Sequence, residues 1–278
     1  MRMLQRLTSA NGGFPALLLA GVLALPVSAE TQRVEGLSVD RVLVKGAVEV
    51  EISQDDEEML LIRGSGKQLA GKPFYIDGGT LVLGASREDR KADFRGVKYK
   101  LSVRELERVQ LQGSGEVYVR PLEADEFYAA VEGTGTIRLF DVQADRATLQ
   151  VTGSGDIQVA ALVAPEVSLV LSGSGDMHLK TLETEETEAS VNGSGDMSLQ
   201  GEGSTHSLEL NIVGSGEIDF RELNAHSIEL NIVGSGSARV GTSKELDVTI
   251  MGSGDVEYRG QPDIDQSILG SGSMTSSD

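Results

Sequence analysis

Hydrophobic and polar residues alternate along most of the chain after residue 100, and short Gly-rich phrases interrupt the alternation at regular intervals. In nearly every copy, the second and fourth residues before the phrase and the fourth and sixth residues after its first glycine are hydrophobic. The residues between them are mostly polar. A period of two is typical of strands that bury one face. Each interval therefore predicts two short strands that meet at a corner.

The interrupting phrase is Gly-Ser-Gly, once Gly-Thr-Gly, and it occurs nine times at steps of 18 to 21 residues. Both glycines allow a positive φ, as a tight corner requires. Its glycine pairs are Gly113 and Gly115, Gly133 and Gly135, Gly153 and Gly155, Gly173 and Gly175, Gly193 and Gly195, Gly214 and Gly216, Gly234 and Gly236, Gly252 and Gly254, and Gly270 and Gly272.

A unit of about 20 residues cannot bury its hydrophobic face alone, but it can do so by stacking on its neighbours. The repeat therefore predicts an all-β fold, a parallel β-helix or solenoid of about nine coils. A β-propeller is the alternative, but its blades need about 40 residues each and more varied turns. A further hydrophobic position predicts a third wall or a second corner; it is held by Leu122, Val142, Leu162, Leu182 and Leu223.

Residues 30–100 lack this repeat but contain other alternating segments, including residues 41–52 on both sides of Gly46 and residues 97–103. Residues 59–63 and 80–83 are further expected strands. We expect residues 30–100 to start the solenoid and to cap its open edge, because an unpaired edge invites association with other chains. Residues 101–278 then form the solenoid itself.

Residues 1–29 have the features of a secretory signal peptide. Arg2 and Arg6 precede an apolar run over residues 14–25, and Val27-Ser28-Ala29 resembles a cleavage site. The apolar run is short for a membrane span, although a retained anchor is the alternative. The sequence thus predicts an exported protein in the periplasm, on the outer surface or in the medium, with no integral membrane segment after cleavage.

The chain is strongly acidic, with a net charge of -19 that becomes -21 when residues 1–29 are removed. Nucleic-acid binding depends on clustered Lys and Arg, so nucleic acid is not an expected partner. The charge favours partners that are cationic or that bring divalent cations. The chain has no cysteine, and no disulfide is therefore expected.

An acidic residue follows the corner in six copies, and four consecutive copies carry Asp156, Asp176, Asp196 and Glu217 there. Coils stacked in register would place these carboxylates in a column at about 5 Å spacing, where they repel one another. We expect each carboxylate to accept hydrogen bonds from the backbone of its own turn. The alternative is weak Ca²⁺ binding, since Ca²⁺ prefers oxygen ligands. No other cofactor and no catalytic residue is predicted.

Two smaller features also suggest contacts. His206 and His226 lie one repeat apart in nearly identical phrases; they could stack and bind a metal with a nearby carboxylate, or simply reflect duplication. Val213, Val233 and Met251 are hydrophobic at an outward position that is polar in earlier coils. This strip predicts either an interaction surface or contact with a neighbouring loop.

Several phrases resemble a known bacterial family. Val44 to Gln54, Asp77 to Leu83 and the recurring Gly-Ser-Gly-Asp resemble the "putative auto-transporter adhesin, head GIN domain" family, and residues 263–273 resemble its closing coil. The resemblance covers about residues 38–275. It implies an exported β-helical domain of the bacterial cell envelope whose role is unassigned, and it supplies no catalytic residues.

Together these features predict an exported, non-catalytic binding or surface module, adhesin-like, whose partner is a protein or a glycan. An envelope-associated regulatory protein and a polysaccharide-active enzyme are the alternatives. The enzyme is disfavoured because Arg120, Arg138 and Lys180 are scattered among small, amidic and acidic outward residues, whereas such a site needs cations beside paired carboxylates.

Overall fold

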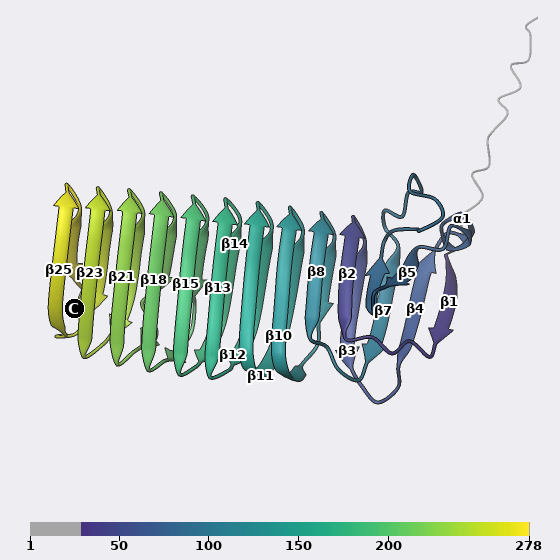
Figure 1. Ribbon diagram of the computed structural model, residues 1–278, viewed down its shortest axis with the longest axis horizontal. Coiled ribbons are helices and arrows are strands. Elements are labelled where there is room, and N and C mark those ends of the chain that lie inside the picture. The colour runs from purple at the N-terminus through teal and green to yellow at the C-terminus, as the bar shows by residue number, and fades with distance from the viewer. Residues whose placement is uncertain (1–28, 278) are drawn as a thin grey trace, which may run out of the picture.

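The computed structural model describes residues 29–277 as one long stack of strands (Figure 1). The predicted signal peptide lies outside the described residues, except for Ala29. The described residues form 26 strands and one short helix, and the nine repeat corners bound about 8 full turns. The predicted all-β parallel solenoid is confirmed, with a turn count close to the expected nine.

One wall of the solenoid, here called the entry sheet, contains the strands that run into the corners. Its parallel strands pair in register over their whole length, so that each corner glycine lies directly on the preceding one. The strands are β2 (Arg41–Gly46), β8 (Arg108–Gly113), the end of β10 (Leu122–Gly133), the end of β11 (Thr136–Gly153), β13 (Glu166–Gly173), β15 (Glu186–Gly193), β18 (Ser207–Gly214), β21 (Ser227–Gly234), β23 (Glu245–Gly252) and β25 (Asp263–Gly270).

A second wall, the exit sheet, contains the strands that leave the corners, and these also pair in parallel. The strands are β3 (Glu49–Gln54), β9 (Glu116–Val119), the start of β11, the start of β12 (Asp156–Val163), the start of β14 (Asp176–Glu183), β16 (Asp196–Leu199), β19 (Glu217–Phe220), β22 (Ser237–Thr242), β24 (Asp255–Arg259) and β26 (Ser273–Ser276).

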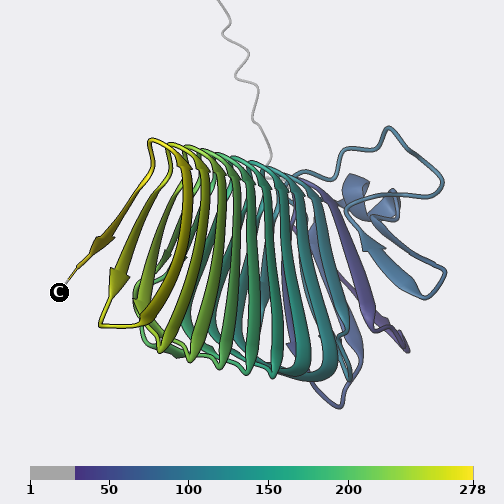
Figure 2. The same cartoon turned by 60° about the vertical axis from the view of Figure 1, so that its left-hand side comes forward.

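The predicted third wall exists and is short. It is formed by the start of β10, the middle of β11, the ends of β12 and β14, and the two-residue strands β17 (Gly203–Ser204) and β20 (Leu223–Asn224). Its inward leucine and valine side chains are at most 4% exposed. Hydrophobic side chains from all three walls form one continuous core along the axis, and the stacked coils enclose it (Figure 2).

The two glycines of each corner share one steric requirement, and the first glycine has a conformational requirement as well. The first glycine has a positive φ in every copy, for example 131° at Gly173. The second glycine does not, so the expectation of a positive φ at both positions is wrong. A Cβ on Gly175 would instead collide with the carbonyl oxygen of Gly155 in the preceding coil. A Cβ on Gly173 would collide with the carbonyl oxygen of Gly153 in the same way. Both glycines thus allow the coils to stack closely, and the first also allows the chain to turn.

The stack begins earlier than the repeat does. Gly46 pairs in register with Gly113, so residues 41–54 form a coil beneath the first Gly-Ser-Gly corner. The later phrase Gly64-Ser-Gly66 is not a corner, because Ser65 caps the helix α1 (Gly66–Ala70).

The N-terminal end of the stack is closed by antiparallel strands, as predicted for a capping region. The exit sheet continues through β7 (Lys98–Val103) to β4 (Met59–Gly64) and β1 (Glu30–Glu35), and the last two pair antiparallel. The entry sheet continues through β6 (Thr80–Leu83) to the antiparallel β5 (Phe74–Asp77). Leu60 and Ile62 of β4 are fully buried, which shows that the core is covered at this end.

Candidate functional site on the outward faces

The two long walls carry different chemistry on their outward faces. Eight Lys and Arg residues follow residue 108, against 28 Asp and Glu, whereas residues 29–108 hold 14 against 15. The negative charge therefore lies almost entirely on the repeats. Six of these eight cations lie on the exit strands or directly after them; they are Arg120, Arg138, Lys180, Arg221, Arg239 and Arg259. What looks scattered in the sequence is gathered on one wall.

The predicted carboxylate column exists on the exit sheet. Asp156, Asp176, Asp196 and Glu217 pair rung by rung. The Oδ1 atom of Asp156 accepts a hydrogen bond from the backbone N–H of Asp176 (3.2 Å), and Asp176 accepts one in the same way from Asp196 (3.3 Å). The carboxylates of Asp156 and Asp176 thus bond to the backbone of the next coil, and not to their own turn as expected.

No group of three or more His, Asp or Glu side chains that could hold a metal occurs between residues 29 and 277. Ca²⁺ binding at the column stays a prediction. His206 and His226 do stack, with ring centroids 4.8 Å apart, and Asn231 donates to Asn211 in the adjoining rung at 3.3 Å.

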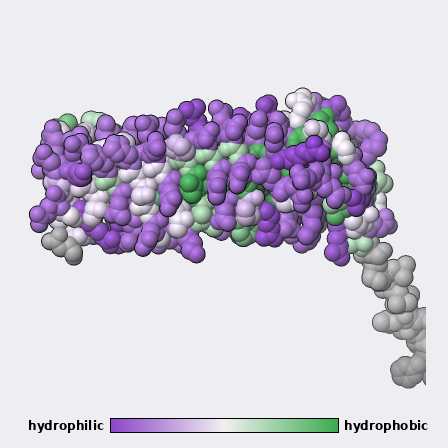
Figure 3. Space-filling model, turned by 90° about the horizontal axis from the view of Figure 1, so that it is seen from below, coloured by the Kyte–Doolittle hydropathy of each residue, from purple (hydrophilic) through white to green (hydrophobic). Residues whose placement is uncertain are grey.

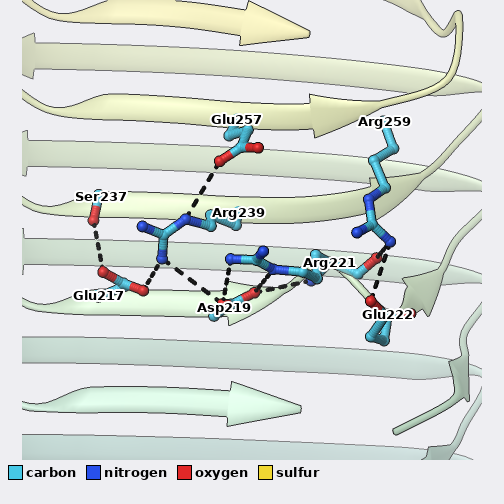
Figure 4. Close-up of polar contacts among 8 residues, drawn as sticks. All are labelled: Glu217, Asp219, Arg221, Glu222, Ser237, Arg239, Glu257 and Arg259. Atoms are coloured by element: carbon cyan, nitrogen blue, oxygen red, sulfur yellow. Dashed lines mark hydrogen bonds and ion pairs between the residues drawn. The ribbon is translucent and has the colours of Figure 1, made fainter. Parts of the chain in front are cut away.

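Further along the exit sheet, the protein's own cations neutralise the acidic side chains (Figure 4). Arg239 forms ion pairs with Glu217 on the preceding coil and with Glu257 on the following one, the latter at 3.3 Å. Arg221 pairs with Asp219 at 2.7 Å, and this contact raises the pKa of the Arg221 guanidinium. This end of the exit sheet is therefore an internally satisfied network.

The first coils of the exit sheet differ because they combine cations with aromatic rings. Arg138 donates to Tyr118 and to Gln158, both at 3.2 Å, and Arg120 lies 4.9 Å from the centre of the Phe140 ring. Tyr118 donates a hydrogen bond to Glu116 at 2.6 Å, and this bond raises the pKa of Tyr118.

A notch interrupts this face at Ala160. Ala160 lies between Phe140 and Lys180 of the neighbouring coils, since the residues on both sides of it pair in register. Its small side chain leaves a groove of about 390 Å³ between the two longer ones. Phe140 is 37% exposed at one wall of the groove. The groove is further lined by Arg138, Leu139, Gln158, Val159, His178, Leu179 and Gln200. In the sequence, the notch becomes visible only when the residues at the seventh position after the first glycine of each corner are compared between repeats.

The predicted hydrophobic strip lies on the entry sheet and is longer than expected. Val213, Val233 and Met251 pair rung by rung and are 41 to 49% exposed. Leu269 continues the strip on β25 and is 73% exposed. Of the two alternatives, contact with a neighbouring loop is therefore wrong for this strip, which faces outward.

Another hollow, of about 680 Å³, lies beside the third wall near the cap. Its lining is largely acidic and includes Glu105, Glu107, Glu123, Asp125 and Glu126.

Seen from below, the surface is mostly hydrophilic, with hydrophobic residues gathered in a narrow band (Figure 3). In the described part of the chain, no helix is long and apolar enough to cross a membrane.

Comparison with known proteins decides the family. The family model described as "Putative auto-transporter adhesin, head GIN domain" matches residues 39–200 and 148–262, in two overlapping stretches that reflect the repeat. The chain belongs to this family. The expected resemblance is confirmed. No match was found among curated proteins.

Three solved structures share the fold of this head GIN domain protein. A "putative lipid binding protein" from Parabacteroides distasonis is 24% identical, with a TM-score of 0.66 over 90% of this chain and 97% of that one. A "putative adhesin" from Parabacteroides merdae is 20% identical, with a TM-score of 0.67 over 90% and 96%. A second "putative adhesin" from P. distasonis is 18% identical, with a TM-score of 0.65 over 91% and 98%.

Proposed function

We propose that this protein is an exported, non-catalytic binding module, adhesin-like, that binds an uncharged glycan at the notch above Ala160. The carrying observation is the notch itself, where an exposed aromatic ring, amide groups and a lysine meet around an alanine floor. Binding sites for small polar ligands combine an apolar surface with a few convergent polar groups. The family description and the adhesin-named neighbours agree with a surface binding role.

The geometry of the rungs supports a sugar as the ligand. Neighbouring rungs of a sheet lie about 4.8 Å apart, and Phe140 and Lys180 lie two rungs apart. The distance between their backbones is therefore about 10 Å. This distance leaves room for one pyranose ring in contact with both side chains. Gln158 and Gln200 offer amide groups beside it, which suit hydroxyl groups. The excess of acidic residues over the repeats repels acidic glycans, so an uncharged glycan is favoured.

A glycan array tests this function, together with variants that change only the notch. Ala160→Gln fills the groove with a glutamine side chain, which the equivalent position of a later coil already carries as Gln200. We expect the affinity for glycan to fall at least tenfold. Phe140→Ala should lose binding to a similar extent because it removes the aromatic wall. Ser190→Gln is the matched control, since Ser190 faces outward on the entry sheet and its ladder already contains Gln150.

Three outcomes would contradict the proposal. If the Ala160→Gln variant binds glycan as tightly as the unmodified chain, the notch is not the binding site. Binding only to proteins in a pull-down from envelope extract would favour the envelope regulatory alternative. Reproducible turnover of any polysaccharide would show that the protein is an enzyme.

A further inference from the structure

The C-terminal coil leaves the core uncovered. Every residue of β25 is exposed, in contrast to the alternating burial of the other entry strands. Ile264 and Ile268 occupy positions that face the core in the preceding coils, but they are 37% and 38% exposed. Ile250, the residue of β23 that pairs with Ile268, is fully buried. The last coil is the open left-hand end of the stack in Figures 1 and 2.

The two ends of the stack are therefore unequal. At the N-terminal end both walls finish with an antiparallel strand, β4 followed by β1 on one wall and β5 on the other. At the C-terminal end, β25 pairs with β23 and with no other strand of residues 29–277. The chain thus already uses antiparallel partners to terminate parallel sheets, and β25 has the free edge such a partner needs.

We propose that a second copy of this chain supplies that partner, with the two β25 strands pairing antiparallel across a two-fold axis. A two-fold axis brings the same surface of both copies together and reverses the direction of the second strand. The N-terminal end of another copy fits less well, since its core is already covered and it exposes no equivalent hydrophobic residues on β1.

The backbone of β25 presents the required hydrogen-bonding groups. Asp263 N–H donates to Lys244 in the preceding coil at 2.8 Å. Because successive N–H groups of a strand point to opposite sides, the N–H groups of Ile264, Gln266 and Ile268 face the open edge. These three residues are also the inward ones, so the hydrogen-bonded pairs of the dimer carry the side chains that extend the core.

Side-chain matching selects one register. With Gln266 opposite Gln266 of the partner copy, Ile264 lies opposite Ile268 of the partner copy, and Asp265 lies opposite Ser267. A shift by one residue toward the N-terminus would set the two Asp265 carboxylates opposite each other, which is unfavourable. A shift in the other direction would place Ile268 opposite Gln266. The chosen register pairs the isoleucines and keeps the carboxylates apart.

Charge predicts how this dimer responds to salt. Each copy carries its excess of Asp and Glu on the repeats, so two C-terminal ends repel one another at low ionic strength. Screening weakens this repulsion, and the dimer should therefore tighten as salt is added. An interface confined to one coil is small and is expected to be weak.

Sedimentation equilibrium of the chain expressed from its full sequence tests the dimer over a wide range of protein concentrations. We expect a monomer–dimer equilibrium whose dissociation constant falls severalfold between low and moderate NaCl. Gln266→Lys should raise that constant at least tenfold, because it sets two ammonium groups opposite each other on the two-fold axis. Ser267→Lys is the matched control and should keep or lower it, since its ammonium group lies opposite Asp265 of the partner copy.

Amide hydrogen exchange provides a second measurement that does not depend on a variant. Exchange at Ile264, Gln266 and Ile268 should slow as protein concentration rises. A chain that stays monomeric at all concentrations, or a dimer in which Gln266→Lys and Ser267→Lys have the same affinity, would overturn the proposal. Neither result depends on glycan binding at the distant notch.

Discussion

At the scale of single residues, the corner glycines do most to define the fold. The first glycine supplies a positive φ, and both glycines leave space for the backbone of the preceding coil. These two requirements explain why the lowest corner reads Gly46-Ala47-Val48. The positive φ is still needed at Gly46, but the second position tolerates Val48 because the close carbonyl contact arises only when a corner lies beneath.

Gly175→Ala tests the requirement for space. We expect a loss of about 2–4 kcal/mol in unfolding free energy, because the new Cβ forces two backbones apart. Denaturant unfolding followed by circular dichroism measures the change. Ser174→Ala is the control, since Ser174 is exposed and its bonding group is its backbone N–H. Equal unfolding midpoints for the two variants would refute the packing argument.

At the scale of elements, one buried side chain supports the hairpin of β5 and β6, whose strand β6 also pairs with β2 of the entry sheet. Tyr99 on β7 donates a hydrogen bond to the Pro73 carbonyl at 2.8 Å and accepts one from the Gly84 N–H at 3.1 Å. Tyr99 is only 1% exposed, and burial raises the pKa of its hydroxyl above the usual range. The neutral hydroxyl therefore joins the hairpin to the exit sheet.

Tyr99→Phe should destabilise the cap by about 1 kcal/mol, because it removes both hydrogen bonds of a buried hydroxyl. The Gly84 N–H and the Pro73 carbonyl keep their own hydrogen bond to each other at 3.0 Å. Thermal unfolding measures the loss, and hydrogen exchange should show faster exchange at the Gly84 amide. Tyr75→Phe on β5 is the control, as the Tyr75 side chain is half-buried. An unchanged midpoint with Tyr99→Phe would mean that the hydroxyl does not anchor the hairpin.

The elements themselves followed from the sequence more fully than the candidate site did. Alternation predicts the walls because burial of one strand face depends on local sequence, and the strands over residues 41–52, 59–63, 80–83 and 97–103 were all found. The helix α1 was missed, since five residues carry little periodicity. The notch at Ala160 depends on which side chains occupy neighbouring rungs, and that becomes visible only when the register is known.

At the scale of the whole molecule, charge is distributed unevenly along the axis. Residues 29–108, which form the cap and the coil before the first repeat corner, are nearly neutral, whereas the residues after 108 carry 28 acidic residues against eight basic ones. Self-repulsion of this kind destabilises a compact state and is reduced by salt. Carboxylates occupy consecutive rungs on both walls: Asp156, Asp176, Asp196 and Glu217 on the exit sheet, and Glu188, Glu209, Glu229, Asp247 and Asp265 on the entry sheet.

Salt dependence separates general screening from specific Ca²⁺ binding. We expect NaCl and CaCl₂ at matched ionic strength to raise the thermal midpoint by the same few degrees, because screening depends on ionic strength alone. An additional shift with CaCl₂ that disappears in Asp176→Asn would instead demonstrate the weak Ca²⁺ site predicted from the sequence. Asp247→Asn, on the entry sheet, is the control for charge removal.

The stacking of corner upon corner also makes length a free variable of this architecture. Residues 206–213 and 226–233 are near duplicates, and their strands pair residue for residue. One copied segment of 20 residues therefore lengthens the rod by one rung, about 4.8 Å, without redesigning the core. Gene duplication can in this way change the distance between the closed end and the open end in steps of one coil.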